Sequence, residues 1–208
     1  MQSVVFDLDG TLIDAAPDIT AVLNRLLAAD GLAALPVAEV RGMIGDGAKT
    51  LLERAFAACG AVAQPSHLAG FIADYEANPV CDTVCYPGIE DTLATLKGQG
   101  RQLGICTNKP IGPTRAILDA LGLTKHFAAI LGGDSTPYKK PDPRHLAAVL
   151  AEMEVSSAIM VGDHHNDLAA AAGLGQEGVF VTWGYGVANA THVASTAQEL
   201  LLRIAEIG

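Results

Sequence analysis

The chain has 208 residues, enough for one domain with an inserted lobe and a substantial buried core. Half of the residues are hydrophobic and 17% are charged, which excludes a disordered or fibrous chain. The formal net charge of −10 argues against a nucleic-acid partner or an anionic membrane, because attraction to either requires a basic surface. An anionic small substrate is compatible with this charge, since a metal ion and a few lysines can reverse the potential inside a cleft.

The N-terminal residues and the cysteines favour a cytoplasmic protein. The chain begins Met-Gln-Ser-Val-Val-Phe-Asp, without the basic start and apolar run of a signal peptide. No apolar run reaches the roughly 18 residues of a membrane-spanning helix. The four cysteines lack the dense spacing of a disulfide scaffold or the paired spacing of a zinc site, so we expect free thiols.

Short apolar runs alternate with helical patterns along most of the chain. This alternation predicts an α/β fold with a Rossmann-like parallel sheet and helices on both of its faces. The expected strands are residues 3–8, 102–106, 128–131, 158–161 and 178–182. Glycine and proline signals predict helices from about residue 88 to 97 and from about 110 to 121, and a last helix covers about 196–204.

One stretch breaks the alternation. Residues 15–84 carry only helical patterns, such as the apolar series from Ile19 to Leu27, and no convincing strand. This predicts a helical cap domain of residues 15–84, inserted after the first strand of a core domain formed by residues 1–14 and 85–208. The hinges are expected near residues 14–17 and 84–87.

Two aspartates follow the first predicted strand, in the motif Asp7-Leu8-Asp9-Gly10-Thr11. In an extended strand Asp7 and Asp9 would face the same side, because strand periodicity is two. Two carboxylates so near to each other repel unless a cation lies between them or one of them keeps its proton. The motif therefore indicates a metal site or an acid–base pair, with a solvated turn as the alternative. A calcium loop is excluded, since Leu12 stands where its glycine is required.

Three more polar motifs follow later strands. They are Thr107-Asn108-Lys109, Lys139-Lys140-Pro141-Asp142-Pro143, and Gly162-Asp163 with Asp167. Each alone is as typical of a helix cap, a solvated face or a turn. Because ligands of open parallel sheets bind outside the carboxyl ends of the strands, we expect all four motifs in one cleft. His164-His165 is not expected to bind a transition metal, since oxygen ligands surround it.

In this order, the motifs resemble those of the haloacid dehalogenase superfamily. Within it, the chain is most similar to phosphoglycolate phosphatases, through residues 107–110, 132–134, 140–143 and 183–186. The resemblance covers the whole chain and implies a Rossmann-like core with a helical cap inserted after the first strand.

The chemistry of phosphoryl transfer assigns roles to the motif residues. Asp7 would be the nucleophile, and Mg²⁺ would neutralise the repulsion between it and the phosphate. Asp7, Asp163 and the backbone carbonyl of Asp9 are the expected metal ligands. Asp9 would act as general acid and then as general base, which requires a raised pKa. Asp167 would orient a ligand or a water beside the metal.

The remaining candidates concern the substrate. Thr107 and Lys140 would bind the phosphoryl group. The family pattern places the lysine directly before Pro-x-Pro, which favours Lys140, and whether Lys139 shares its role is open. Asn108 and Lys109 could each face the cleft or cap the helix, and Asn108 is a candidate substrate contact. In the cap, residues 44–49 resemble a substrate-specificity loop, with Gly45 and Lys49 as candidate substrate contacts.

The resemblance implies a Mg²⁺-dependent phosphatase that hydrolyses a small-molecule phosphate monoester through an aspartyl-phosphate intermediate. The favoured substrate is 2-phosphoglycolate. A sugar phosphate, pyrophosphate or a phosphomutase reaction are the alternatives, and a dehalogenase is disfavoured because that branch lacks the second aspartate. A non-enzymatic module that binds phosphorylated ligands has little use for both Asp7 and Asp9. The sequence does not indicate the oligomeric state.

Overall fold

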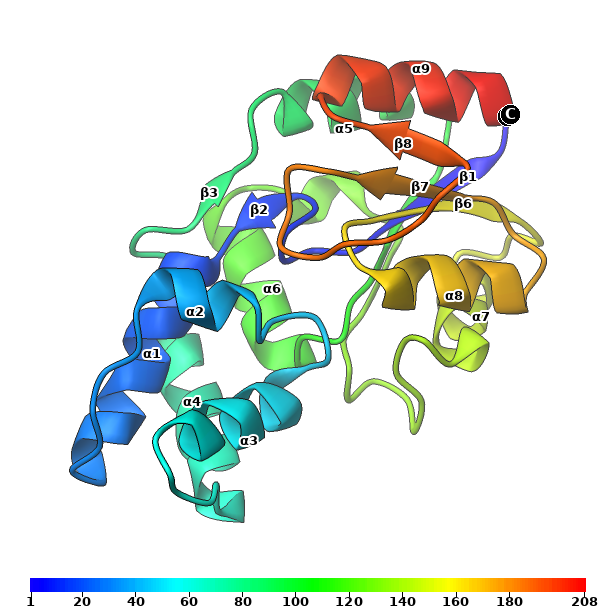
Figure 1. Cartoon of the computed structure of the whole chain (residues 1–208). Helices are drawn as coiled ribbons and strands as arrows, with labels where there is room; N and C mark the ends of the chain where they lie inside the picture. The colour runs from blue at the N-terminus through cyan, green and yellow to red at the C-terminus, as the bar shows by residue number, and fades with distance from the viewer.

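A parallel sheet of six strands forms the centre of the computed structural model, which describes residues 1–208 (Figure 1). The strand order is β5-β4-β1-β6-β7-β8, and every neighbouring pair is parallel. The strands are β1 (Ser3–Phe6), β4 (Leu103–Cys106), β5 (Ala129–Leu131), β6 (Ala158–Gly162), β7 (Gly178–Val181) and β8 (His192–Ala194). The first strand therefore lies in the middle of the sheet, between β4 and β6.

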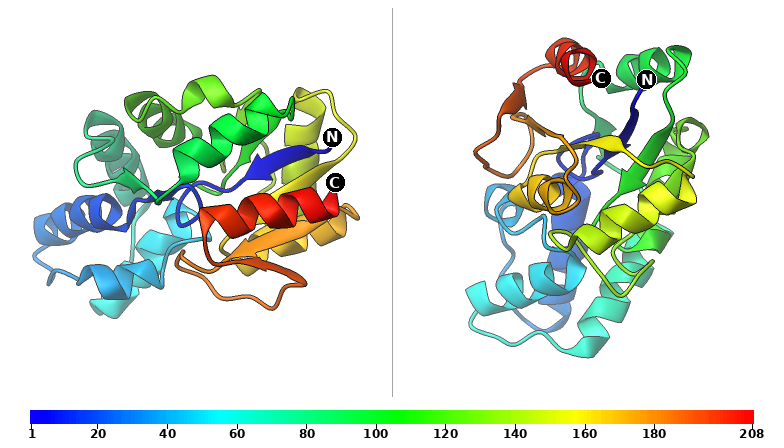
Figure 2. Two further views of the ribbon diagram at one scale, coloured as in Figure 1. Left: turned by 90° about the horizontal axis from the view of Figure 1, so that it is seen from above. Right: turned by 90° about the vertical axis from the view of Figure 1, so that its right-hand side faces the viewer.

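Helices cover both faces of the sheet. Helices α5 (Ile89–Gly98), α6 (Ile111–Ala120) and α9 (Ala197–Ile207) pack on one face, and α7 (Pro143–Glu152) and α8 (His165–Gly173) pack on the other. A short 3-10 helix, η1 (Thr124–His126), precedes β5. Figure 2 shows both termini at the same edge, where the backbone N–H of Gln2 donates to the carbonyl of Gly208.

The two-sided cover explains the continuous apolar character of the strands. Val4 and Phe6 of β1 belong to the apolar cluster under α5, whereas Val5 between them belongs to the cluster under α7. Successive side chains of a strand point to opposite faces, so a strand buried on both faces needs apolar residues at every position. This confirms the predicted α/β fold and its five predicted strands, with ends that differ by no more than two residues.

One strand of the six-stranded sheet was not indicated by the sequence. β8 contains only three residues and pairs with β7 alone, at the edge of the sheet. Its side chains read His192, Val193 and Ala194, and Val193 is exposed. So short a segment has no apolar run, which leaves no pattern to detect.

The segment after β1 forms a helical lobe beyond the carboxyl ends of the strands. Its helices are α1 (Ala16–Ala29), α2 (Val37–Arg41), α3 (Ala48–Ala58) and α4 (Pro65–Ala77). The chain leaves and re-enters the core through two short antiparallel strands, β2 (Ile13–Asp14) and β3 (Val84–Cys85). The predicted hinges fall on this ribbon, whereas the division into residues 1–14 with 85–208 and 15–84 stays a prediction.

The ribbon is reinforced by one buried carboxylate. Asp18 on α1 accepts hydrogen bonds from the backbone N–H groups of Cys81, Asp82 and Thr83 and from the Thr83 hydroxyl. Burial opposes its ionisation, but these hydrogen bonds outweigh burial and hold the pKa of Asp18 below its usual value. The start of the cap is thereby fixed to the segment that returns to the core.

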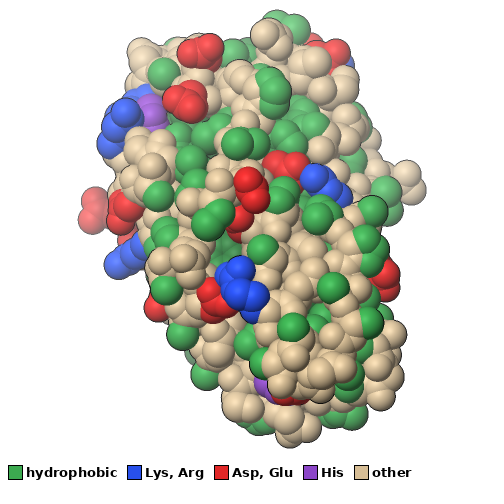
Figure 3. Space-filling view, turned by 90° about the vertical axis from the view of Figure 1, so that its left-hand side faces the viewer, with side chains coloured by type: hydrophobic (Ala, Val, Ile, Leu, Met, Phe, Trp, Pro, Cys, Tyr) green, Lys and Arg blue, Asp and Glu red, His purple; other side chains and the backbone are tan.

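The lobe packs closely on the core. One cluster of 35 buried residues includes Leu23, Leu52 and Phe56 of the cap together with Phe6 and Ile105 of the sheet. On the face shown in Figure 3, charged side chains of both signs are scattered among polar and apolar ones, without a patch of one kind. No helix has both the length and the apolar character that crossing a membrane requires.

Candidate active site

The four polar motifs meet at one edge of the sheet. Asp7 follows β1, Thr107 follows β4, Lys140 lies in the loop after β5, and Asp163 follows β6. Because β1 pairs with both β4 and β6, the carboxyl ends of these three strands are adjacent. The site lies at the point where the strand order reverses, the usual ligand position in open α/β sheets.

Three buried carboxylates and one buried ammonium form the centre of this edge. Oxygen atoms of Asp7, Asp163 and Asp167 all lie within 4.8 Å of one another. The Nζ atom of Lys140 lies 3.0 Å from Asp7 Oδ1 and 2.5 Å from Asp167 Oδ1. Burial lowers the pKa of Lys140, but the charges of Asp167 and Asp7 outweigh it and keep the pKa above its usual value.

The centre carries more negative than positive charge. Burial, with the nearby charge of Asp7, raises the pKa of Asp163 to about 6, and burial likewise raises the pKa of Asp167. Asp7 Oδ1 is buried and forms no hydrogen bond, although the Lys140 ammonium lies 3.0 Å from it. A divalent cation would relieve the repulsion and give this oxygen a further partner, and carboxylate oxygens are the ligands that Mg²⁺ prefers. The residues present therefore fit a magnesium ion.

Asp163 is fixed by its surroundings. Its Oδ1 accepts a hydrogen bond from the Thr11 hydroxyl (3.0 Å), and its Oδ2 accepts from the backbone N–H groups of Tyr185 (2.7 Å) and Gly186 (3.3 Å). Gly10 has φ +83°, and a Cβ there would lie 2.3 Å from Asp163 Oδ2. Only glycine fits this position, so the loop after β1 can close over the carboxylate.

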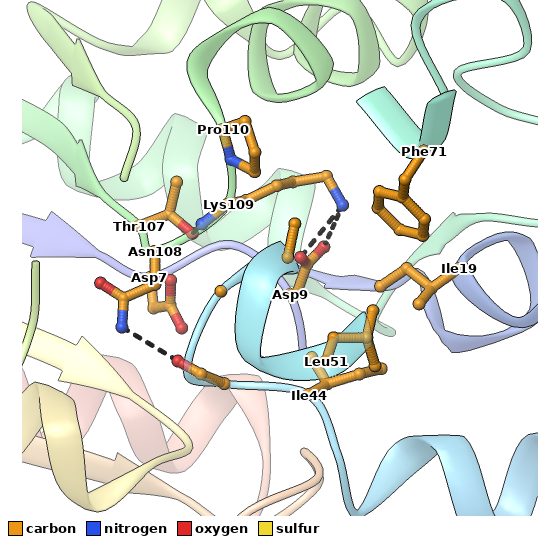
Figure 4. A pocket seen from close by; sticks show the side chains of 13 residues that line it. Asp7, Asp9, Ile19, Ile44, Leu51, Phe71, Thr107, Asn108, Lys109 and Pro110 are labelled. Atoms are coloured by element: carbon orange, nitrogen blue, oxygen red, sulfur yellow. Dashed lines mark hydrogen bonds and ion pairs between the residues drawn. The ribbon is translucent and has the colours of Figure 1, made fainter. Parts of the chain in front are cut away.

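Asp9 pairs with a different lysine from the one that pairs with Asp7. The Nζ atom of Lys109 lies 3.1 Å from Asp9 Oδ2 and 3.3 Å from Oδ1, in the pocket shown in Figure 4. Strand periodicity is not the reason for the placement of Asp7 and Asp9, because β1 ends at Phe6, but both line the same pocket. Burial raises the pKa of Asp9 above its usual value; Lys109 opposes this shift, and Asp7 adds to it.

Lys109, like Asn108, was expected either to face the cleft or to cap the helix. The structure places it in the cleft, with its side chain buried and its Nζ 4.1 Å from the centre of the Tyr75 ring on α4. At this distance the ammonium interacts favourably with the face of the ring. Lysine after a strand is common on protein surfaces, so the sequence carried no signal for this burial.

Asn108 joins the core motifs to the cap. Its Nδ2 donates to the carbonyls of Lys140 (2.9 Å) and Gly45 (3.0 Å), and its Oδ1 accepts from the backbone N–H of Lys140 (2.9 Å). These bonds occupy the side-chain amide that the sequence suggested for substrate. In this structure Asn108 instead fixes the Lys140 loop and the cap loop.

The cap loop that includes residues 44–48 closes over the core motifs. A Cβ on Gly45, which has φ +123°, would lie 2.9 Å from His164 Cδ2. Asn166 Nδ2 of the core donates to Asp46 Oδ1 of the loop at 2.7 Å. Lys49 does not reach the pocket: its side chain is 73% exposed and lies 3.8 Å from Glu53. Lys139 is also exposed.

A pocket lies between the motifs and the cap. The core contributes the polar part of its wall, and the cap contributes a mainly apolar part. The lining residues are Asp7, Asp9, Ile19, Ile44, Gly45, Gly47, Ala48, Leu51, Phe71, Thr107, Asn108, Lys109 and Pro110. Asp7 is therefore accessible from the pocket while its other side faces Lys140.

Known proteins are similar to this chain in sequence and fold. A family model described as haloacid dehalogenase-like hydrolase matches residues 1–175. A phosphoglycolate phosphatase of Cereibacter sphaeroides (strain ATCC 17029 / ATH 2.4.9) is 44% identical over 189 residues, 89% of this chain and 87% of that protein. One from Caulobacter vibrioides is 43% identical over 189 residues, 88% and 80% of the two chains. The crystal structure of a predicted phosphoglycolate phosphatase from Haemophilus somnus 129PT has a TM-score of 0.89, 28% identity and 97% coverage of each chain.

A Rossmann-like sheet with buried aspartates and a lysine at its carboxyl edge, under a helical cap, is the architecture of a capped hydrolase. The chain belongs to the haloacid dehalogenase-like hydrolase family, and it is a phosphatase.

The hydrogen bonds of Asn108 lead to a prediction about the cap loop. In Asn108→Ala, the carbonyl of Gly45 and the backbone N–H and carbonyl of Lys140 lose their partners. We expect the free energy of unfolding to fall by about 1–3 kcal/mol, because buried polar groups become unpaired. We also expect faster amide hydrogen exchange in residues 44–48 and at Lys140, measured by mass spectrometry.

Asn78→Ala is the matched control, because this asparagine is exposed and its side chain donates hydrogen bonds to Asp74 and not to the loop. Exchange in Asn108→Ala that equals exchange in the control and the wild type would contradict the assigned role of Asn108.

Proposed function

We propose that the phosphatase hydrolyses 2-phosphoglycolate, that it requires Mg²⁺, and that Asp7 is the nucleophile. The observation that supports this most strongly is that the Asp7 carboxylate faces both the pocket and the acidic centre. Its carboxylate lines the pocket and also lies 3.0 Å from Lys140 in the acidic centre. A nucleophile for an anionic ester needs this combination of access and compensating positive charge.

Asp7 and Asp163 of the acidic cluster would hold the metal, together with the backbone carbonyl of Asp9 that the family resemblance implies. When bound, Mg²⁺ supplies positive charge that reduces the repulsion between the Asp7 carboxylate and the phosphate. Asp167 pairs with Lys140 and accepts a hydrogen bond from the backbone N–H of His164 (3.0 Å). Its proposed role is therefore to hold Lys140 in place at the edge of the metal site.

In the first step, an oxygen of Asp7 attacks the phosphorus and the bond to the ester oxygen breaks. Lys140 and the hydroxyl of Thr107 stabilise the negative charge on the transferring group. Asp9 gives its proton to the departing alkoxide, which leaves as an alcohol. Its raised pKa favours the protonated form that this role requires.

In the second step, Asp9 has become a carboxylate and accepts a proton from water as the water attacks the phosphorus of the aspartyl phosphate. The bond between phosphorus and Asp7 breaks, which releases inorganic phosphate and restores both aspartates. The cap limits the access of bulk water and of large substrates, because Ile19, Leu51 and Phe71 line the pocket beside Asp9.

The choice of 2-phosphoglycolate rests on the names of the relatives and on the small pocket. A phosphate-release assay over a panel of monoesters, with Mg²⁺ and with EDTA, tests it. We expect 2-phosphoglycolate to have the highest kcat/KM and EDTA to abolish release. Asp7→Asn should lower kcat by at least about 10³-fold, because the amide is a poor nucleophile.

A higher kcat/KM for a sugar phosphate or for pyrophosphate would contradict the assignment of 2-phosphoglycolate as the substrate. Isomerisation without phosphate release would indicate a mutase. Near wild-type release by Asp7→Asn would contradict the nucleophile assignment, and activity that survives EDTA would contradict the metal requirement.

The role of Asp9 gives a separate prediction. In Asp9→Asn, hydrolysis of 2-phosphoglycolate should fall by about 10²–10⁴-fold, because the alkoxide leaves without a proton. With p-nitrophenyl phosphate, whose leaving group needs no proton, we expect a rapid burst of nitrophenolate and then slow turnover. The burst is measured by stopped-flow absorbance, and the phosphorylated chain by mass spectrometry. Turnover of both esters by the variant at the wild-type rate would contradict the role of Asp9 in the mechanism.

A further inference from the structure

We propose that Lys109 selects substrates whose leaving group carries a second negative charge, so that charge selection lies on the core and the cap contributes size selection. This inference rests on the proposed function, because it concerns the leaving group of the same ester. The ligand class is a phosphate monoester with a short anionic group, such as a carboxylate, one or two carbons from the ester oxygen.

The position of Lys109 carries the inference. Its Nζ lies 3.1 Å from Asp9, the residue that contacts the leaving oxygen in the proposed mechanism. A group attached to that oxygen must therefore pass close to the ammonium. In Figure 4 the side chain of Lys109 extends across the pocket and ends between Asp9 and Phe71.

Lys109 is also the only lysine, arginine or histidine that lines the pocket. The cap arginines have carboxylate partners elsewhere, since Arg25 pairs with Asp74, Arg41 with Asp14 and Arg54 with Asp46. The remaining polar floor of the pocket is acidic because of Asp7 and Asp9, which would repel an anionic leaving group. A second negative charge is therefore favourable only beside Lys109.

Tyr75 provides a second observation at the same place. Its ring centre lies 4.1 Å from Lys109 Nζ, and its buried hydroxyl forms no hydrogen bond of ordinary geometry, although Lys109 and Thr83 lie close to it. It lies one helical turn after Phe71, which lines the pocket. A buried unpaired donor is costly, and a carboxylate drawn to Lys109 would bring an acceptor close to it.

The cap walls set the size of the leaving group. Ile19, Ile44, Ala48, Leu51 and Phe71 surround the space next to Lys109 and offer no polar side-chain atom. A long or hydroxyl-rich leaving group would leave its polar groups unpaired against these side chains. The combination of one cation and apolar walls fits a small carboxylate better than a sugar.

The test compares two esters of the same shape: 2-phosphoglycolate and its carboxamide analogue, the phosphate ester of glycolamide. For the wild type we expect kcat/KM to be at least about tenfold higher for the carboxylate. In Lys109→Met the preference should fall to nearly equal values, because the charge is lost while the volume is kept. Lys109→Arg should retain most of the preference.

Lys125→Met is the control, because this lysine is exposed in η1, ahead of β5, and far from the pocket. It should change neither kcat/KM. Lys109→Gln is measured in parallel, with circular dichroism of each variant, so that a folding defect in Lys109→Met does not decide the result.

Each outcome separates the two proposals. If both esters slow equally in the folded Lys109 variants and the preference persists, Lys109 only positions Asp9 and the inference is overturned, while the proposed function stands. If the wild type hydrolyses 2-phosphoglycolate and its amide with equal kcat/KM, the inference is overturned, whereas the proposed substrate still depends on the monoester panel alone.

Discussion

The buried ammonium of Lys140 lies between Asp7 and Asp167, and the arrangement of the whole site depends on it. Without this charge, three carboxylates within 4.8 Å of one another would repel each other in a region closed to solvent. Removal of one partner from a buried ion pair costs about 3–5 kcal/mol, because the other charge is left unpaired. Asn108 then fixes the backbone of Lys140, so the loops after β1, β4 and β5 are joined to α8.

The same hydrogen bonds connect the chemistry to the cap. Asn108 reaches Gly45 and Asn166 reaches Asp46, so the cap loop is held by a few hydrogen bonds to residues beside the acidic centre. Each such bond contributes about 0.5–1.5 kcal/mol net, which is small compared with the packing inside either lobe. The cap loop is therefore held over the pocket by weak contacts, whereas the cap as a whole shares one apolar cluster with the core.

Much of the fold could be predicted from the sequence, because strands buried on both faces need continuous apolar runs. The ribbon of β2 and β3 could not be predicted, since two residues on each side carry no periodic pattern. The meeting of Asp7, Thr107, Lys140 and Asp163 at one edge of the sheet could also be predicted, because the carboxyl ends of parallel strands lie there together. Individual side-chain directions were harder to predict: Lys49 follows Ala48 at the start of α3, where Ala48 faces the pocket and Lys49 faces solvent. The position of Lys109 in the pocket depends on its contacts with Asp9 and Tyr75, which are distant in the sequence and leave no local pattern.

The central claim is that the excess negative charge of Asp7, Asp163 and Asp167 forms a magnesium site. Isothermal titration calorimetry of Mg²⁺ into the wild type and into Asp163→Asn tests it most directly. The account predicts saturable binding to the wild type and an affinity lower by at least about tenfold in the variant, because one carboxylate ligand is lost. Equal affinity in the two proteins, or no binding to the wild type, would contradict it.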